Sequence, residues 1–372
     1  MGWGFAGALL KLLFSEGLAA FQQSWFAPRC RCYSHRVKKS GWIGITAAAL
    51  VLVLGGGALA VGNYVYISAT SVPCAINDDD LANKPEEFYV PGSGNGPFPG
   101  PGWEKWVGHD ISEWWMVGVP YEPVMIPVAE GVELSAWWIT PIEGNGKTVI
   151  VTHGIGTSRR DYNTLLPAGM LVKSGFNVLL VDSRDTGEST CVDGRHSAGQ
   201  EESSDFAAVA EWLVSKQGVV PSSLGMLGIS GGAVATSLLP AKTDLISAFA
   251  MEGTIFDFNA AATQEVEYQG FPGFLWQLVL VAAQLFHGVN LTETSAMEGI
   301  EAAGYRPLLI LHGDSDQRLV YQSSVDFYEY GQSVGADITL ETFVGADHTE
   351  GMLTEPGRYA NLLTEFFDSA LD

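Results

Sequence analysis

The chain is poor in basic side chains. Its 372 residues include 19 Lys and Arg against 42 Asp and Glu, giving a formal net charge of -23 at pH 7. The imbalance grows after Ser40, where 13 basic residues face 41 acidic ones. Because such a domain repels phosphate backbones and anionic surfaces, we expect no nucleic-acid partner. An acidic surface often serves only solubility, so the charge indicates no particular substrate.

One long stretch lacks charged side chains altogether. Residues 41–67 contain none, and about 20 apolar residues in a helix cross the hydrocarbon layer. We therefore predict a single transmembrane helix, with Trp42, Tyr64 and Tyr66 as interfacial anchors. The basic cluster just before it predicts a cytoplasmic N-terminus and an extracytoplasmic remainder. A cleaved signal peptide ending near Ala58-Leu59-Ala60 is the alternative, although about 40 residues precede the run and the charged region of a signal peptide is short.

Cysteine is also scarce, with four in the chain. Cys30 and Cys32 lie in the expected cytoplasmic segment, residues 1–40, whose Trp, Phe and Leu residues predict an interfacial helix. These two cysteines are candidates for reduced thiols or acylation sites, and a C-x-C spacing alone is a poor metal signal. Cys74 and Cys191 follow the apolar run and could form a disulfide, but their separation in space is not given by the sequence.

The rest of the chain divides by composition. Residues 68–120 are expected to be a linker, because residues 90–102 are rich in Pro and Gly and predict no core. Residues 121–372 then remain, and about 250 residues suit one large α/β domain.

Gly228-Ile229-Ser230-Gly231-Gly232 is the most informative motif of this domain. It is a G-x-S-x-G pentapeptide between an apolar run, residues 223–229, and a helix-forming stretch that begins at Ala233. This context predicts a buried strand, a sharp turn and a helix, with the serine hydroxyl raised above the sheet. Ser230 is therefore a candidate nucleophile. A glycine-rich turn without chemistry is the alternative, since Gly and Ser are common residues.

A serine hydroxyl needs a histidine and a carboxylate to become a strong nucleophile. Residues 307–316 predict an apolar strand that ends in a polar loop with Asp314 and Asp316. Residues 337–344 alternate like a strand and are soon followed by His348. Because parallel strands present their carboxyl ends at one edge of a sheet, we expect these groups to lie near Ser230.

A possible oxyanion hole is predicted upstream. Residues 147–152 predict a core strand that runs into the turn His153-Gly154-Ile155-Gly156. The backbone amides of Ile155 and Gly231 would then be the two donors to a developing oxyanion. The side chain of His153 is interpreted as structural, because this chemistry needs the neighbouring backbone.

These motifs, together with the turns at residues 182–189 and 345–348, resemble the α/β-hydrolase superfamily of serine hydrolases over residues 121–372. The chain order of serine, acid and histidine is the order of that architecture. The resemblance implies a mostly parallel sheet of eight strands with helices on both faces. It places the acid at Asp316, the last residue of an H-G-x-x-D pattern, with Asp314 as second choice and Asp347 bonding locally beside His348. The proline that often follows the acid is absent here.

The hydrophobic pattern agrees with this fold class. Residues 123–128 and 132–140 predict a hairpin, and residues 177–181 a central strand. Helical segments are expected around residues 161–172, 204–215, 233–239, 322–334 and 356–370. Such alternation predicts a parallel sheet covered on both faces.

An insertion at about residues 253–305 is the expected lid. Its stretch 271–286 is apolar almost all round, and it is too short to span a bilayer comfortably. It therefore predicts a cap helix buried against the core, or a segment that lines an acyl-chain pocket or touches the membrane surface.

The resemblance is closest to membrane-anchored α/β-hydrolase-domain proteins that act on lipid esters such as monoacylglycerols and lysophospholipids. We expect two-step acyl transfer to Ser230, with His348 as base and Asp316 as its partner, and no cofactor or metal. The expected partners are a small-molecule or lipid ester and the membrane, and the oligomeric state is left open. A peptidase, amidase or thioesterase would use the same triad, and a non-catalytic, membrane-tethered binding module is the alternative from another class.

Overall fold

A computed structural model describes residues 39–76, 81–90, 104–106 and 108–372. The chain forms two compact units, Met1–Leu54 and Gly55–Asp372. The sheet and its covering helices belong to the second unit. The expected interfacial helix in residues 1–40 and the cysteines Cys30 and Cys32 lie outside the described residues.

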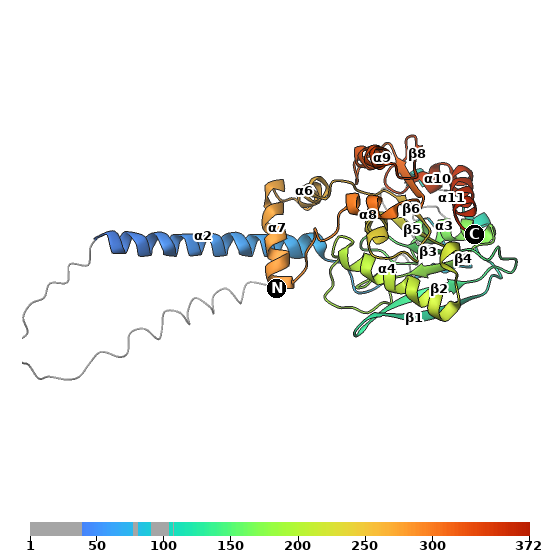
Figure 1. Ribbon diagram of the computed structural model, residues 1–372, viewed down its shortest axis with the longest axis horizontal. Helices are drawn as coiled ribbons and strands as arrows, with labels where there is room; N and C mark the ends of the chain where they lie inside the picture. Colours follow the sequence, from blue (N-terminus) through green and yellow to red (C-terminus); the bar gives the residue numbers. More distant parts are fainter. Residues whose placement is uncertain (1–38, 77–80, 91–103, 107) are drawn as a thin grey trace, which may run out of the picture. The chain divides into compact units, whose positions relative to one another are not determined.

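An eight-stranded sheet organises the second unit and confirms the predicted fold class (Figure 1). The order across the sheet is β1-β2-β4-β3-β5-β6-β7-β8. β1 and β2 form an antiparallel hairpin, β2 pairs antiparallel with β4, and the other neighbours are parallel. The strands are β1 (Tyr121–Ala129), β2 (Val132–Ile139), β3 (Thr148–Thr152), β4 (Asn177–Val181), β5 (Leu224–Ile229), β6 (Ala248–Glu252), β7 (Leu308–Gly313) and β8 (Ile338–Phe343).

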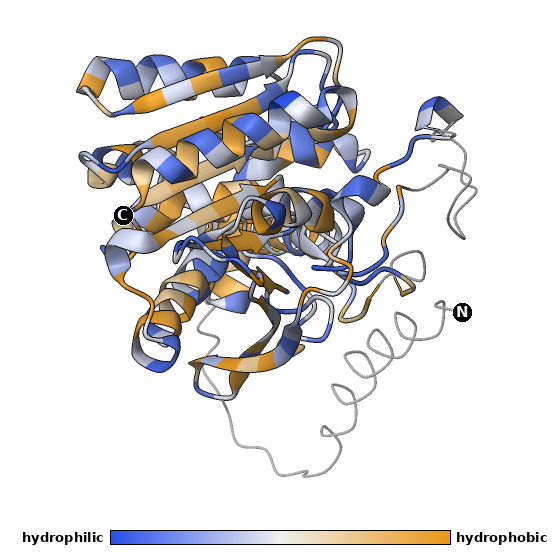
Figure 2. Ribbon diagram, turned by 90° about the vertical axis from the view of Figure 1, so that its right-hand side faces the viewer, coloured by the Kyte–Doolittle hydropathy of each residue, from blue (hydrophilic) through white to orange (hydrophobic). Residues whose placement is uncertain are grey.

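Helices cover both faces of this sheet. The central strands are therefore buried on both sides, and their sequences are apolar at successive positions. Every residue of β3, β5, β6 and β7 is buried. The α-helices in the described part of the chain are α2 (Lys39–Thr70), α3 (Tyr162–Lys173), α4 (Gln200–Trp212), α5 (Gly231–Leu238), α6 (Phe258–Tyr268), α7 (Trp276–Ala282), α8 (Ala296–Ala303), α9 (Gln322–Val334), α10 (Gly351–Thr354) and α11 (Pro356–Ala370). Figure 2 shows hydrophobic central strands between helices of mixed hydropathy.

Alternate residues of the strands feed two separate hydrophobic cores, one on each face of the sheet. Val149 and Val151 of β3 pack with α3 and α11 in the first core. Ile150, between them, packs with α4, α5, α8 and α9 in the second core. Local signals fix the helix starts as well. The Asp161 side chain accepts a hydrogen bond from the backbone of α3, and Ser295 begins a capping box at α8.

The insertion between β6 and β7 contains three α-helices, of which one packs on the sheet and two pack elsewhere. Helix α8 belongs to the sheet, because Ile300 lies in the second core and Gly299 packs directly against the backbone of Ser237. Helices α6 and α7 instead form a small third cluster with the end of α2. Within the expected lid of residues 253–305, only α6 and α7 pack apart from the sheet, and these two helices with the turn after α7 are called the lid below.

The described residues between α2 and β1 pack into the domain and are not a free linker, contrary to the expectation for residues 68–120. Phe88, Val90, Ile111 and Met116 are all buried in the first core. No periodic pattern predicts this packing, because these apolar residues are widely spaced among polar ones. The Pro/Gly-rich residues 91–103 lie outside the described part.

Helix α2 has an exposed apolar stretch followed by turns that pack against the rest of the domain. Leu50–Thr70 is long and apolar enough to cross a membrane, and its side chains from Leu50 to Leu54 are more than half exposed. Its last turns are packed instead. Tyr66 is 1% exposed and its ring lies 4.6 Å from that of His287, whereas Tyr64 is 63% exposed. Tyr66 is therefore not the membrane-interface anchor that the sequence suggested.

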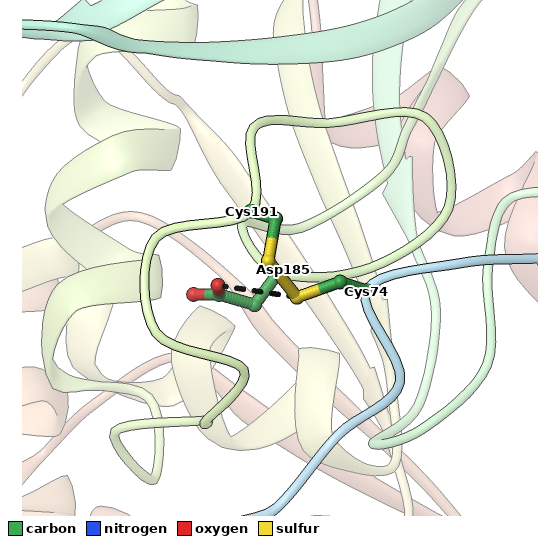
Figure 3. A group of neighbouring side chains, drawn as sticks. All are labelled: Cys74, Asp185 and Cys191. Carbon is green, nitrogen blue, oxygen red and sulfur yellow. Dashed lines mark hydrogen bonds between the residues drawn. A yellow bond between two sulfur atoms is a disulfide. The ribbon is translucent and has the colours of Figure 1, made fainter.

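A disulfide joins Cys74 to Cys191 and settles the pairing that the sequence left open (Figure 3). It ties the segment after α2 to the loop after β4, across 117 residues of sequence. Asp185, whose Oδ1 lies 3.8 Å from the Cys74 Sγ, stiffens the same loop by accepting hydrogen bonds from three consecutive backbone amides, those of residues 192–194. The sulfurs are bonded to each other, so this group offers no thiolates to a metal.

Replacing Cys74 by Ser should lower the free energy of unfolding by about 2–4 kcal/mol, because the open chain gains conformational freedom in the unfolded state. Urea unfolding of the full chain in detergent, followed by tryptophan fluorescence, measures this. Cys30→Ser is the control and should leave the midpoint unchanged. Equal midpoints for Cys74→Ser and the unmodified chain would show that the bridge does not stabilise the fold.

Candidate active site

Ser230 occupies a strained turn between β5 and α5. Its backbone φ of 53° and ψ of -114° lie in a region that residues other than glycine rarely adopt. The neighbouring glycines make the turn possible, since a Cβ at Gly232 would lie 2.7 Å from the carbonyl oxygen of His153. The Ser230 amide is anchored in turn by a 2.8 Å hydrogen bond to the Glu252 carbonyl at the end of β6. The hydroxyl is thereby held at the carboxyl edge of the sheet.

The structure brings Ser230, His348 and Asp316 together, as the sequence predicted. His348 Nε2 lies 2.8 Å from the Ser230 Oγ, and its Nδ1 lies 2.7 Å from the Asp316 Oδ2. His348 follows β8 and Asp316 follows β7, so three loops at one sheet edge supply the group. This arrangement allows the imidazole to accept the hydroxyl proton while the carboxylate holds its other nitrogen.

The Asp316 carboxylate is surrounded by donors. Its Oδ1 accepts the backbone N–H groups of Arg318 and Leu319, each at 2.7 Å. Its Oδ2 accepts from His312 Nε2 at 2.9 Å in addition to His348. Burial alone would raise the pKa of Asp316, but the hydrogen bonds from His312 and His348 outweigh it and hold that pKa well below its usual range. The carboxylate is therefore ionised at neutral pH.

His312 is a supporting residue to which sequence reasoning gave no role. Its Nδ1 lies 2.6 Å from the Ser324 hydroxyl, which leaves Nε2–H to donate to Asp316. The available signal was its position four residues before the acid, as the first residue of the H-G-x-x-D pattern. Because Asp316 Oδ2 accepts from His348 Nδ1–H, the other nitrogen of His348 is free to accept from Ser230.

The other candidate acids lie outside this chain of contacts. Asp314 is exposed, and its Oδ1 accepts the Gly345 N–H at 2.7 Å. Asp347 Oδ1 accepts the backbone N–H groups of Gln317 and His348, each at 2.8 Å. Asp347 thus fixes the loop that carries the histidine, as expected from its neighbouring position.

The predicted oxyanion donors are neighbours. A Cβ on Gly231 would lie 2.9 Å from the Ile155 amide nitrogen, and both residues line the pocket in front of Ser230. Among the described residues neither amide has a protein acceptor, so both remain available to an oxyanion. The His153 side chain is buried, and its Nε2 accepts the Ser183 N–H at 2.9 Å. It ties together the loops after β3 and β4, a structural use of the side chain.

Ser230 and His348 open into a pocket of about 470 Å³, within the usual range of about 300–1,000 Å³ for small-molecule sites. Apolar side chains dominate its outer wall, which is formed by Phe258, Val266, Trp276, Val279 and Leu291 with Ala69 of α2 and Val72 just after that helix. Arg318 and Glu265 form an ion pair on one side. The pocket suits a ligand with a long apolar part and few polar groups.

Glu252 is a second buried acid at this edge, and the sequence reasoning did not single it out. Burial raises its pKa to about 8, and the charge of Asp316 acts in the same direction. The Tyr359 hydroxyl donates to Glu252 Oε2 at 2.6 Å. The side chain is therefore neutral at pH 7. An acid at the end of the apolar run Ala248-Phe249-Ala250-Met251 was the available signal.

The fold, the serine turn and the contact of serine with histidine and acid define an α/β-hydrolase of the serine hydrolase type. Residues 167–372, more than half of the chain, match the prolyl oligopeptidase family. The chain belongs to the prolyl oligopeptidase family, Peptidase S9. Ser230, Asp316 and His348 all lie in the matched segment.

Individual proteins and solved structures are also similar to this chain. The human protein ABHD12B is 24% identical over 232 residues, which is 61% of this chain and 59% of that protein. This chain thus matches less than two thirds of that protein. An esterase of Pyrococcus furiosus, Pf2001, shares the fold with a TM-score of 0.56 and 23% identity over 68% of this chain and 94% of its own. A puromycin-hydrolyzing peptidase of Mycobacterium tuberculosis has a TM-score of 0.56 and 20% identity over 69% of this chain and 40% of its own.

The pKa of Glu252 predicts a pH-dependent stability. Between pH 4.5 and about 8 the folded state keeps a proton that the unfolded chain has lost. Stability should therefore fall by up to about 1.4 kcal/mol per pH unit as the pH rises through this window. Glu252→Gln is neutral in both states and should remove this contribution.

Urea unfolding at pH 5, 6, 7 and 8 measures the effect, with Glu130→Gln in the exposed β1–β2 turn as the control. A Glu252→Gln profile as steep as that of the unmodified chain would mean that Glu252 is ionised in the fold.

Proposed function

We propose that the chain is a membrane-anchored serine hydrolase that cleaves carboxylic esters with long acyl chains through an acyl-serine intermediate. The observation that carries the proposal is the Ser230–His348–Asp316 contact at the base of a largely apolar pocket. In this proposal Ser230, His348 and Asp316 are the catalytic residues, and the amides of Ile155 and Gly231 form the oxyanion hole.

The first step transfers the acyl group to the enzyme. His348 Nε2 takes the Ser230 proton while Oγ bonds to the ester carbonyl carbon. The carbonyl oxygen becomes an oxyanion and accepts hydrogen bonds from Ile155 and Gly231. The tetrahedral species collapses, the C–O bond to the alcohol breaks, and the imidazolium gives its proton to the departing alkoxide.

The second step regenerates the serine. Water loses a proton to His348 as its oxygen attacks the acyl-serine, and the imidazolium then returns a proton to Ser230 Oγ as the carboxylic acid leaves. Asp316 stays ionised throughout, which orients the imidazole and stabilises its positive form.

The ester and lipid parts of the proposal have separate support. A largely apolar pocket favours an acyl chain over a polar peptide. The length and composition of α2 support a membrane anchor, and the basic cluster before Ser40 supports a cytoplasmic N-terminus. The Cys74–Cys191 bridge supports an extracytoplasmic domain, because disulfides persist mainly in oxidising compartments.

A peptidase or amidase is the second candidate. The name of the family and that of the mycobacterial relative both refer to peptidases. Amide hydrolysis would use the same three side chains. Arg318 and Glu265 of α6 form an ion pair in the pocket lining, and this pair could bind a charged peptide terminus.

Ser230→Ala should abolish labelling by a fluorophosphonate probe and lower ester turnover by at least about 10³-fold, because no nucleophile remains. Asp316→Asn should lower kcat by about 10⁴-fold while the fold is kept. Ser315→Ala, on the neighbouring exposed loop, is the control and should label normally. Labelling that persists in Ser230→Ala would assign the nucleophile elsewhere.

Substrate comparison separates the candidate classes. Turnover of a long-chain monoacylglycerol, a short nitrophenyl ester, a thioester and an aminoacyl amide is measured on the full chain in one preparation. We expect the long-chain ester to give the highest kcat/KM. A higher kcat/KM for the amide would favour the peptidase, and absence of both labelling and turnover would leave a binding module.

A further inference from the structure

The end of the apolar helix α2 lies inside the substrate pocket. Ala69 and Thr70 of its last turn line the same cavity as Ser230 and His348, and Val72 continues the wall beyond the helix. The opposite wall comes from the lid, with Phe258 and Val266 among its side chains. A segment that the sequence presents as an anchor thus contributes side chains to the site of the proposed chemistry.

This end of α2 is fixed to both neighbouring structures. Against the lid, Asn63 bonds to His287 at 2.7 Å, and Gly62 approaches α7 so closely that a Cβ would lie 2.5 Å from the Leu278 carbonyl oxygen. Against the loop after β4, the backbone of His196 donates to the Thr70 carbonyl at 2.9 Å. The contacts hold the last turn of α2 in place with no room for another side chain between the helices.

The segment just after α2 is held in place as well. Val72 N–H donates to the Gly194 carbonyl at 2.9 Å, and the Cys74–Cys191 bridge follows. His196 Nε2 lies 3.2 Å from the carbonyl oxygen of Ala69. The position of the Ala69 Cβ relative to the cavity is therefore set by backbone contacts on either side of it.

With Gly41 to Ala60 of α2 as the proposed membrane anchor, the length of the helix brings this wall near the membrane surface. The 20 residues from Gly41 to Ala60 span about 30 Å as a helix, which is the thickness of the hydrocarbon layer. Residues from Val61 onward then lie at the interface, where they meet the lid. The lid exposes large apolar side chains in the same region of the chain, including Phe274, Leu285 and Phe286, which is the composition that partitions to an interface.

We propose that the last turn of α2 is the acyl-chain wall of the substrate pocket, so that the membrane-spanning helix itself guides one acyl chain of a membrane lipid from the bilayer to Ser230. This inference rests on the proposed ester hydrolysis. The inference adds that Ala69 determines which acyl-chain lengths the pocket accepts. Ala69 is small, and a larger side chain at this position would fill part of the cavity.

The test introduces bulk at Ala69 in the full chain, reconstituted in dioleoylphosphatidylcholine vesicles. Nitrophenyl esters of 2 to 16 carbons and a monoacylglycerol are the probes. Ala69→Leu should shift the preferred ester to shorter chains, and Ala69→Trp should lower the ratio of kcat/KM for long over short esters at least tenfold. Ile67→Trp, on the exposed side of the same turn and outside the pocket lining, is the matched control and should keep the ratio of the unmodified chain.

Fluorophosphonate labelling of Ser230 and a melting curve accompany each variant. If Ala69→Trp fails to fold, the smaller Ala69→Leu decides. A chain-length profile unchanged by Ala69→Leu or Ala69→Trp would overturn the proposal while leaving ester hydrolysis intact. A shift of the same size in Ile67→Trp would also overturn it, because the effect would then come from the membrane. An unmodified chain that neither labels nor cleaves any ester would instead remove the proposed function on which the inference rests.

Discussion

The buried Asp316 carboxylate is the group on which the site depends. It accepts four hydrogen bonds, two from the backbone of its own loop and one each from His312 and His348. A buried charge without such donors would take up a proton or unfold its surroundings. Because the donors come from β7, from the loop after it and from the loop after β8, satisfying one carboxylate also fixes the imidazole that reaches Ser230.

A second acid at the same edge takes the opposite state for the same physical reason. The side chain of Glu252 is buried like that of Asp316 but receives two donors, the Tyr359 hydroxyl and the Gly351 backbone, and the nearby negative charge disfavours its ionisation. Two carboxyl groups at one edge of the sheet therefore have different charge states: Asp316 is ionised and Glu252 is protonated. Only the carboxylate at Asp316 can stabilise an imidazolium, whereas the neutral Glu252 receives the Tyr359 hydroxyl and supports the turn through its backbone carbonyl.

The sheet, Ser230 and His348 were predicted from local patterns, whereas the choice of Asp316 over Asp314 came from the resemblance to the α/β-hydrolase superfamily. Strands buried on two faces are apolar throughout, and the side chains that follow them meet at one edge. Glu252 and the packed residues around Phe88 depend on partners far away in the chain, such as Tyr359, which a single sequence does not identify. His312 lies only four residues before Asp316, but a buried histidine beside an acid has the same local pattern whether or not it supports that acid. Tyr66 was misread for the same reason, since an aromatic residue at the end of an apolar run has the same pattern whether lipid or protein covers it.

Helix α2 resolves that ambiguity through its own composition. It has 32 residues, about a dozen more than a bilayer requires. Polar side chains, among them Asn63, Ser68 and Thr70, are concentrated near its end, after the long apolar stretch. The Ser68 and Thr70 hydroxyls donate to carbonyls of the preceding helical turn, whereas the Asn63 side chain bonds to His287 and the Thr70 carbonyl accepts from the loop after β4. The change in composition along α2 therefore coincides with the part of the helix that packs against the lid and the loop after β4.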